Sequence, residues 1–222
     1  MGINKKLNSL FKEYKSQRNF FRDGVFNESK FKSSKVKILF LLKEINGNEN
    51  DSWDLREIVK DNTRSATWIN AGKIHYILNN NYPHYNNILN LNEQEITQSI
   101  NSIASINLSK KAGKGKANYS RIYKEATDKF RLWKTQIDII NPDIVICGGT
   151  FDIVQELFEK NKIIDKKEIK ETSNGMNYFY HNKMPFIDFV HPAFFGRCRL
   201  SFGYSFLKGA IKITSTGKIA RL

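Results

Sequence analysis

The sequence predicts an α/β protein: a three-layer α/β/α sandwich around a central, mainly parallel, four-stranded sheet. Four apolar runs rich in β-branched residues each stop abruptly at polar residues or a turn former, as buried strands do. Segments with helical spacing of their apolar residues separate these runs, and strands that alternate with helices indicate a parallel sheet. The expected strands are residues 36–42, 103–107, 143–147 and 184–190.

The helices and one further strand complete this pattern. A helix over 119–140 is expected to stop before Pro142, because the residue before a proline disfavours the helical conformation. Thr150 is a natural N-cap for the helix that follows the third strand. Residues 176–181 are expected to form an edge strand that is hairpinned to the fourth strand. The other expected helices are residues 3–22, 65–79, 92–100 and 199–213.

The bulk composition bounds the class of protein. A chain of 222 residues fits a single domain, residues 1–222, with a basic N-terminal helical segment over 1–35. Hydrophobic residues make up 40% of the chain, which excludes a disordered protein. The net charge of +14 favours a polyanionic partner such as DNA, although a solvated lysine face would give the same balance. No run of 18 apolar residues is present, so we expect no membrane span.

Cysteine and histidine usage argues against a metal or cofactor. The two cysteines, Cys147 and Cys198, are too few for a four-cysteine zinc or iron–sulfur site and do not form a disulfide framework. His75, His84 and His181 lack cysteine or carboxylate partners at metal-binding spacing. We therefore expect a cytoplasmic, DNA-associated monomer that binds no metal and no cofactor.

Two strand ends carry residues typical of catalysis. The first strand runs directly into Lys43 and Glu44, and the fourth strand runs directly into His191. Ligands of open α/β sheets bind outside the carboxyl ends of the strands. A carboxylate and an imidazole at two such ends are therefore well placed to meet over one substrate.

Four motifs in this order resemble those of the uracil-DNA glycosylase superfamily, over about residues 36–207. Family members carry an Asp, Asn or Glu after the first strand, where this chain has residues 42–47 (LKEING). Their second strand ends in a base-reading asparagine, similar to Asn107, and their third resembles residues 142–149 (PDIVICGG). A His-Pro motif follows their last strand, as His191 does here.

The first motif departs from the family pattern. Leu42 or Lys43 stands where the family has glycine, and Ile45 stands where it has proline. Glu44 is the acid in both acid-bearing alignments, whereas in a third alignment Asn46 takes its role. The cysteines of the iron–sulfur branches are missing. The tyrosine that closes the pocket of the strict uracil enzymes is also absent, which leaves room beside C5 of a pyrimidine.

The resemblance implies a role for each residue of the site. Glu44, or alternatively Asn46, would stabilise the positively charged sugar or activate water, and His191 would donate a hydrogen bond to the departing base. Asn107 would read the pyrimidine edge. Each residue also has a purely structural alternative. Glu44 could be a solvated loop acid and Asn46 a turn residue, while His191 could be an ordinary strand-end histidine and Asn107 a backbone cap at its strand end. The remaining candidate base-binding residues are Ile45 and Trp53. Trp53 would stack on the extruded base, or alternatively would only cap the sheet.

Basic and aromatic residues around the site are candidates for DNA contacts. A lysine-rich loop over 110–116 could clamp phosphates, or serve only as a solvated linker. The turn at 148–150 could seat a phosphate at a helix start, or be a simple connection. An aromatic pair after His191 could wedge into the base stack, or belong to the core. These candidates are Lys110, Lys111, Lys114, Lys116, Gly148, Gly149, Thr150, Phe194, Phe195 and, on a phosphate, Arg197.

The sequence thus predicts a monofunctional DNA glycosylase that removes uracil or a modified pyrimidine and leaves an abasic site. No amine nucleophile is assigned, so water is the expected attacking group. A modified phage base, and with it a role in antiviral defence, would fit the open first motif. The alternative is a catalytically inactive DNA-binding module that recognises a modified base. A nucleotide-binding enzyme is disfavoured because no GxxxxGK[ST] or GxGxxG motif follows a strand.

Overall fold

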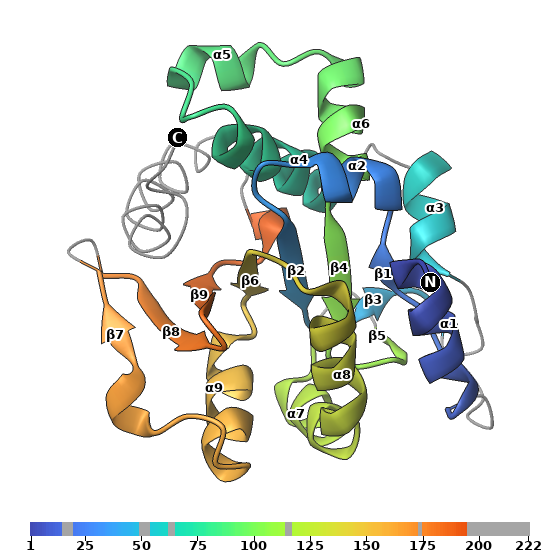
Figure 1. The fold of residues 1–222 in the computed structure, drawn as a ribbon, viewed down its shortest axis with the longest axis vertical. Coiled ribbons are helices and arrows are strands. Elements are labelled where there is room, and N and C mark those ends of the chain that lie inside the picture. Colours follow the sequence, from blue (N-terminus) through green and yellow to red (C-terminus); the bar gives the residue numbers. More distant parts are fainter. Residues whose placement is uncertain (15–19, 49–53, 62–64, 114–116, 173–174, 195–222) are drawn as a thin grey trace.

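A seven-stranded sheet forms the centre of the protein (Figure 1). The computed structural model describes residues 1–14, 20–48, 54–61, 65–113, 117–172 and 175–194. The strand order is β1-β4-β2-β6-β9-β8-β7. Its four central strands are parallel, and they are β4 (Ala104–Asn107), β2 (Ile38–Leu42), β6 (Ile144–Gly148) and β9 (Met184–Phe189). They coincide with the four expected runs, so the mixed α/β class with a parallel sheet at its centre is confirmed.

The expected number of strands, four, is wrong. Three antiparallel strands extend the sheet at its edges, namely β1 (Gly24–Val25) on β4, and β8 (Asn177–His181) and then β7 (Lys170–Glu171) beyond β9. Only β8 had an apolar pattern, and it matches the expected edge strand. Strands of two residues such as β1 and β7 are too short to show a periodicity. A separate two-stranded sheet pairs β3 (Ile45–Asn46) with β5 (Ala112–Gly113).

The expected helices that lie within the described residues are present with changed bounds, and the short helices Glu28–Ser33, Leu55–Asp61 and Tyr85–Leu89 were not expected. The expected helix over 119–140 is divided at Lys129, where the indole N–H of Trp133 donates to the carbonyl of Ala126 at 2.9 Å in the last turn of the first half. The expected helix over 3–22 ends at Lys12, and the one over 199–213 lies outside the described residues. The helices are α1 (Ile3–Lys12), α2 (Glu28–Ser33), α3 (Leu55–Asp61), α4 (Ala66–Asn79), α5 (Tyr85–Leu89), α6 (Glu93–Asn101), α7 (Tyr119–Asp128), α8 (Phe130–Ile140) and α9 (Phe151–Lys160), with 3₁₀ turns η1 (Lys166–Glu168) and η2 (Pro192–Phe194).

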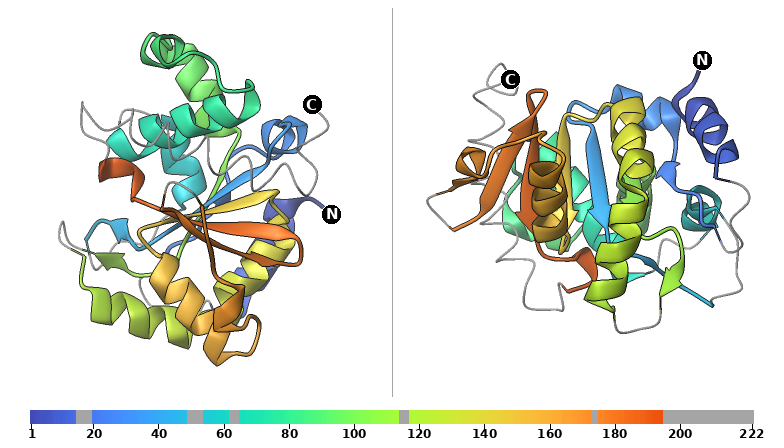
Figure 2. Two further views of the ribbon diagram at one scale, coloured as in Figure 1. Left: turned by 90° about the vertical axis from the view of Figure 1, so that its left-hand side faces the viewer. Right: turned by 90° about the horizontal axis from the view of Figure 1, so that it is seen from below.

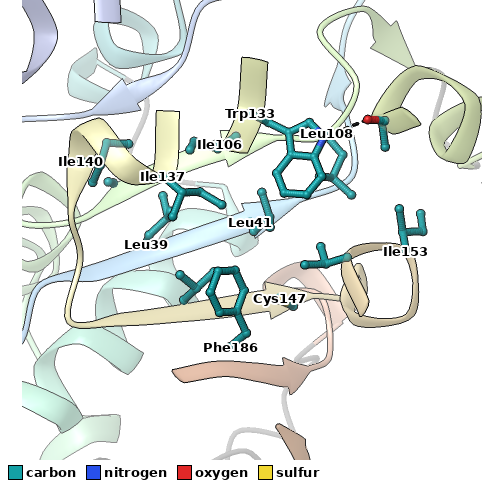
Figure 3. Packing of buried hydrophobic residues seen from close by; sticks show 14 of the residues in the cluster. Leu39, Leu41, Ile106, Leu108, Trp133, Ile137, Ile140, Cys147, Ile153 and Phe186 are labelled. Carbon is teal, nitrogen blue, oxygen red and sulfur yellow. Dashed lines mark hydrogen bonds between the residues drawn. The ribbon is translucent and has the colours of Figure 1, made fainter. Parts of the chain in front are cut away.

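Alternate residues of β2 face two different parts of the core. Leu39 and Leu41 pack with α1, α8 and α9, where Trp133 is fully buried (Figure 3). Phe40 and its neighbours on the other side of the strand pack with α3, α4 and α6. Helices therefore cover both faces of the sheet (Figure 2). Burial on both faces explains why each central strand is a continuous apolar run rather than an alternating one.

The strand order creates a switch point between β2 and β6. From β2 the chain crosses to β4 on one side, and it then passes to β6 and β9 on the other side. In open α/β sheets the crevice outside the carboxyl ends at such a point is the usual place for a ligand. The carboxyl ends of β2, β6 and β9 lie at this edge, and they lead into Lys43, Gly149 and His191.

Protonation of His75 is expected to destabilise the fold. The ring lies in α4, is 7% exposed, and has one nitrogen 3.2 Å from the Ser34 hydroxyl, while Nδ1 has no hydrogen-bond partner among the described residues. Burial lowers the pKa of His75 to about 4. The folded state then binds fewer protons than the unfolded state below pH 6.5, so about 3 kcal/mol of stability is lost as the pH falls from 6.5 toward 4.

Urea unfolding of the wild type and of His75→Gln at pH 7 and pH 5 measures this loss. We expect the free energy of unfolding to fall less between the two pH values in the variant than in the wild type. His84 is exposed, so His84→Gln is the matched control and should keep the wild-type difference. A wild-type pH dependence in His75→Gln would contradict the assignment.

Candidate functional site

Glu44 lies where the chain leaves the main sheet for the small one. The amides of Leu108 and Ser109 donate to the carbonyls of Leu42 and Lys43, each at 2.9 Å, so the ends of β2 and β4 continue side by side. The next residues form β3, which pairs with β5 instead. Glu44 therefore lies in a hydrogen-bonded connection between the two sheets and not in a solvated loop.

The carboxylate of Glu44 is buried, and only one of its two oxygens has a partner among the described residues. Its side chain is 6% exposed, and Oε2 is ion-paired with the guanidinium of Arg121 from the first turn of α7. Arg121 also donates to the carbonyl of Ala112 at 3.0 Å. A Cβ at Gly113 would lie 2.0 Å from Cδ of Glu44, so any larger residue there would displace this carboxylate. Oε1 is buried and has no hydrogen-bond partner among the described residues, which leaves an acceptor for a water or a ligand.

Burial raises the pKa of Glu44, although the charges of Arg121 and Lys43 favour the carboxylate. A carboxylate with a raised pKa is a better general base than an ordinary solvated one. The alternative of a solvated loop acid does not fit a side chain that is this buried. Glu44 can thus accept a proton from water or face a cationic centre.

His191 is oriented by the turn that follows β9. Its Nδ1 accepts from the amide of Ala193 at 3.2 Å, and Asn70 of α4 donates to the carbonyl of Pro192 at 2.8 Å. An accepting Nδ1 places the proton of the neutral ring on Nε2. Burial, and after it the charge of Lys43, lower the pKa of His191. The ring is therefore neutral at pH 7 and offers an Nε2–H donor.

Two glycines allow the ends of β2, β6 and β9 to approach each other. A Cβ at Gly148 would lie 2.6 Å from Cδ2 of Leu42 and 3.7 Å from Cα of His191. Gly149 has a φ of +68°, in the left-handed region. A Cβ there would lie 3.3 Å from Nζ of Lys43 and 3.8 Å from the backbone nitrogen of His191. The sheet edge therefore brings the Lys43 side chain and the His191 backbone close to the same glycine.

At the turn that was expected to seat a phosphate, the Gly149 amide and the Thr150 hydroxyl are already engaged. The amide of Gly149 donates to the carbonyls of Cys147 and Phe189, at 2.9 and 2.7 Å. The Thr150 hydroxyl is buried and donates to the carbonyl of Leu41 at 2.7 Å instead of capping α9. These groups hold the strands together, so the alternative of a strand-to-helix turn fits the structure.

Asn107 and Lys110 belong to a buried polar cluster. Both oxygens of Asp23 bind the Lys110 ammonium at 2.7 and 2.8 Å. Asp23 also accepts from the backbone N–H of Asn107 at 2.7 Å and from the side-chain amide of Gln136 at 2.8 Å. Lys110 is 1% exposed and Asn107 is 2% exposed. The expectation that Lys110 holds a phosphate is therefore wrong for this structure, because the ammonium is enclosed. The Asn107 side chain is enclosed as well, with its Nδ2 3.5 Å from Oδ2 of Asp23.

The remaining candidates are placed less closely around the site. Ile45 is in the hydrophobic core, whereas Asn46 next to it is exposed. Lys111 is exposed and pairs with Glu125 at 2.7 Å. Phe194 follows His191 in η2 and is 58% exposed. Five other candidates lie outside the described residues, namely Trp53, Lys114, Lys116, Phe195 and Arg197, as does Cys198.

Sequence reasoning missed three residues that organise the site: Asp23, Lys43 and Arg121. Arg121 meets Glu44 from 77 positions away, and Lys110 meets Asp23 from 87 positions away, so no local pattern reveals either pair. The one available signal was Asp23 itself, since it is an acid inside a basic segment. Lys43 was visible only as a departure from the glycine of the first motif.

Within the described part of the chain, no group of three or more histidine, cysteine, aspartate and glutamate side chains could hold a metal ion. None of the helices there is both long and apolar enough to cross a membrane. No protein-family model matches the chain, and no curated protein is significantly similar to it.

Proposed function

We propose that the protein is a monofunctional DNA glycosylase that hydrolyses the N-glycosidic bond of an extruded uracil or modified pyrimidine. One observation carries this proposal. A buried carboxylate whose Oε1 has no partner among the described residues, Glu44, and a neutral imidazole with an Nε2–H donor, His191, follow parallel strands of the same sheet. The charge of one side chain, Lys43, acts on both groups. Helices on both faces of the sheet support the three-layer α/β/α sandwich that the resemblance implies.

The chemistry of the bond requires such a pair. As the bond to the base breaks, positive charge develops on the sugar and negative charge on the base. The carboxylate of Glu44 would stabilise the sugar and accept the proton of the attacking water. The Nε2–H of His191 would donate to the base carbonyl as it becomes anionic.

The surface near the site supports DNA as the substrate. The net charge of +14 favours a polyanion, and the exposed Lys111 follows β4 at the same sheet edge. Extrusion of a paired base costs a few kcal/mol, which a wedge inserted into the stack would offset. Phe194, exposed beside His191, is the described residue best placed for that role. Asn46 is exposed and small, which supports a pocket open to a modified pyrimidine and a role against modified phage DNA.

The test is base release. The protein is incubated with duplex and single-stranded oligonucleotides that carry uracil, and with phage DNA that carries modified cytosines. Free base is detected by mass spectrometry and abasic sites by alkaline cleavage. We expect one pyrimidine to be released with an equal number of abasic sites. No release from any substrate, with DNA still bound, would overturn the proposal.

A second function has one observation in its favour. The ion pair between Glu44 and Arg121 secures the small sheet to α7, which is a structural role that needs no reaction. A binding module that reads a modified base would retain this pair. Such a module would bind modified DNA more tightly than unmodified DNA and would release no base.

A further inference from the structure

The positive charge of Lys43 acts on both proposed catalytic groups, Glu44 and His191. It follows β2 directly and precedes Glu44 in the chain. A Cβ at Gly149 would lie 3.2 Å from its Cε and 3.3 Å from its Nζ, and 3.8 Å from the backbone nitrogen of His191. The ammonium group therefore lies against Gly149, on the approach to His191.

The charge of Lys43 is not committed to a structural partner. Among the described residues, its ammonium has no ion pair or hydrogen bond, whereas the guanidinium of Arg121 is bound to Glu44 and the ammonium of Lys110 is enclosed with Asp23. The Lys43 side chain is half-buried, so its field is screened less than that of a surface lysine. An uncommitted cation in this position favours a ligand that carries negative charge.

We propose that Lys43 is a catalytic residue whose ammonium group forms an anion subsite against Gly149 and stabilises the departing pyrimidine as a monoanion. This inference rests on the proposed function. In the reaction, the C1′–N1 bond breaks and both of its electrons leave with the base. Water oxygen bonds to C1′, the Glu44 carboxylate takes the water proton, and the base anion is protonated afterwards from solvent.

A phosphate of the DNA is the other anion that a lysine could hold. Two groups that could complete a phosphate seat beside Lys43 are already engaged, which favours the base over a phosphate as the anion. The Gly149 amide and the Thr150 hydroxyl both donate to strand carbonyls. Two groups near Lys43 remain, namely Glu44 and His191. These are the side chains proposed to act on the sugar and on the base.

A cation at the leaving group changes how the rate depends on the base. Charge stabilisation matters most for a base that leaves poorly and least for one that is already a good anion. The wild-type rate should therefore depend only weakly on the acidity of the base N1. Without Lys43 this dependence should become steeper, whereas a residue with a merely structural role would slow all bases by the same factor.

The experiment is a single-turnover comparison of wild type, Lys43→Met and Lys43→Arg. Each pyrimidine that the wild type releases is paired with an analogue of more acidic N1, for example uracil with 5-fluorouracil. We expect Lys43→Met to slow the poorer leaving group about 100-fold and the better one only about 10-fold, and Lys43→Arg to recover most of the rate. Lys37→Met is the matched control, because Lys37 lies at the amino end of the same strand and pairs with Asp143.

Three outcomes would count against the inference, and they are separable. A uniform loss of rate for all bases in a folded Lys43→Met would overturn the anion subsite while leaving the proposed function intact. Loss of DNA affinity alone, with a salt dependence reduced by about one phosphate contact, would assign Lys43 to the DNA backbone. If the wild type released no pyrimidine at all, the proposed function would fail and the inference with it.

Discussion

Replacing Glu44 by glutamine is expected to reduce the single-turnover rate of base release by about 100-fold or more. Glutamine keeps the shape of the side chain and a hydrogen bond to Arg121, but it can neither take the water proton nor balance positive charge on the sugar. The rate is measured under enzyme excess so that product release does not limit it. DNA affinity should change far less than the rate.

The matched control is Glu125→Gln. Glu125 lies on α7, as Arg121 does, but it pairs with the exposed Lys111 outside the buried site. A similar loss of rate in both variants would contradict a specific role for Glu44. The pH dependence gives a second check. Because the ionised carboxylate is the active form and its pKa is raised, the rate should fall with decreasing pH at a value above 4.5. Arg121→Gln removes a charge that favours the carboxylate, so it should move that fall to still higher pH.

Replacing Asp23 by alanine is expected to destabilise the fold by about 3–5 kcal/mol. The substitution leaves the Lys110 ammonium buried without a counter-charge and removes acceptors from Asn107 and Gln136. Urea unfolding followed by circular dichroism measures the loss as a lower midpoint. A loss below about 1 kcal/mol would contradict the enclosed ion pair, since that is the range of exposed pairs.

Two further variants isolate the cause of this loss. Asp138→Ala breaks the exposed pair with Lys134 and should cost no more than about 1 kcal/mol. The double variant Asp23→Leu with Lys110→Met replaces the buried pair by apolar groups and should be more stable than Asp23→Ala. A double variant as unstable as the sum of its single variants would show that the two side chains act independently.

The parts of the fold that sequence reasoning predicted are those with a strong local pattern. The four central strands are buried on both faces, so each appears as an unbroken apolar run. The helices α4 and α6 begin at side-chain caps from Ser65 and Asn92. The break at Lys129 was missed because apolar spacing continues through it, and the Trp133 indole that satisfies a freed carbonyl is a tertiary contact.

The candidate site was predictable only in part, for a related reason. Strand-end positions follow from the pattern, so Glu44 and His191 fall at the sheet edge as expected. The state of a polar side chain depends instead on partners distant in sequence. Lys110 looks like the first residue of a lysine loop, and only the position of Asp23 shows that it is interior.

The buried cluster around Asp23 also determines which N-terminal truncations the fold can tolerate. The basic N-terminal segment supplies Asp23 and the strand β1, and Glu28 caps α1 through the amides of Ile3 and Asn4. A truncated chain that began at the first central strand would lose the counter-charge of Lys110 and expose the edge of β4. This segment is therefore not a removable tail for binding DNA, and fusion or expression boundaries drawn after it would sever the folded unit.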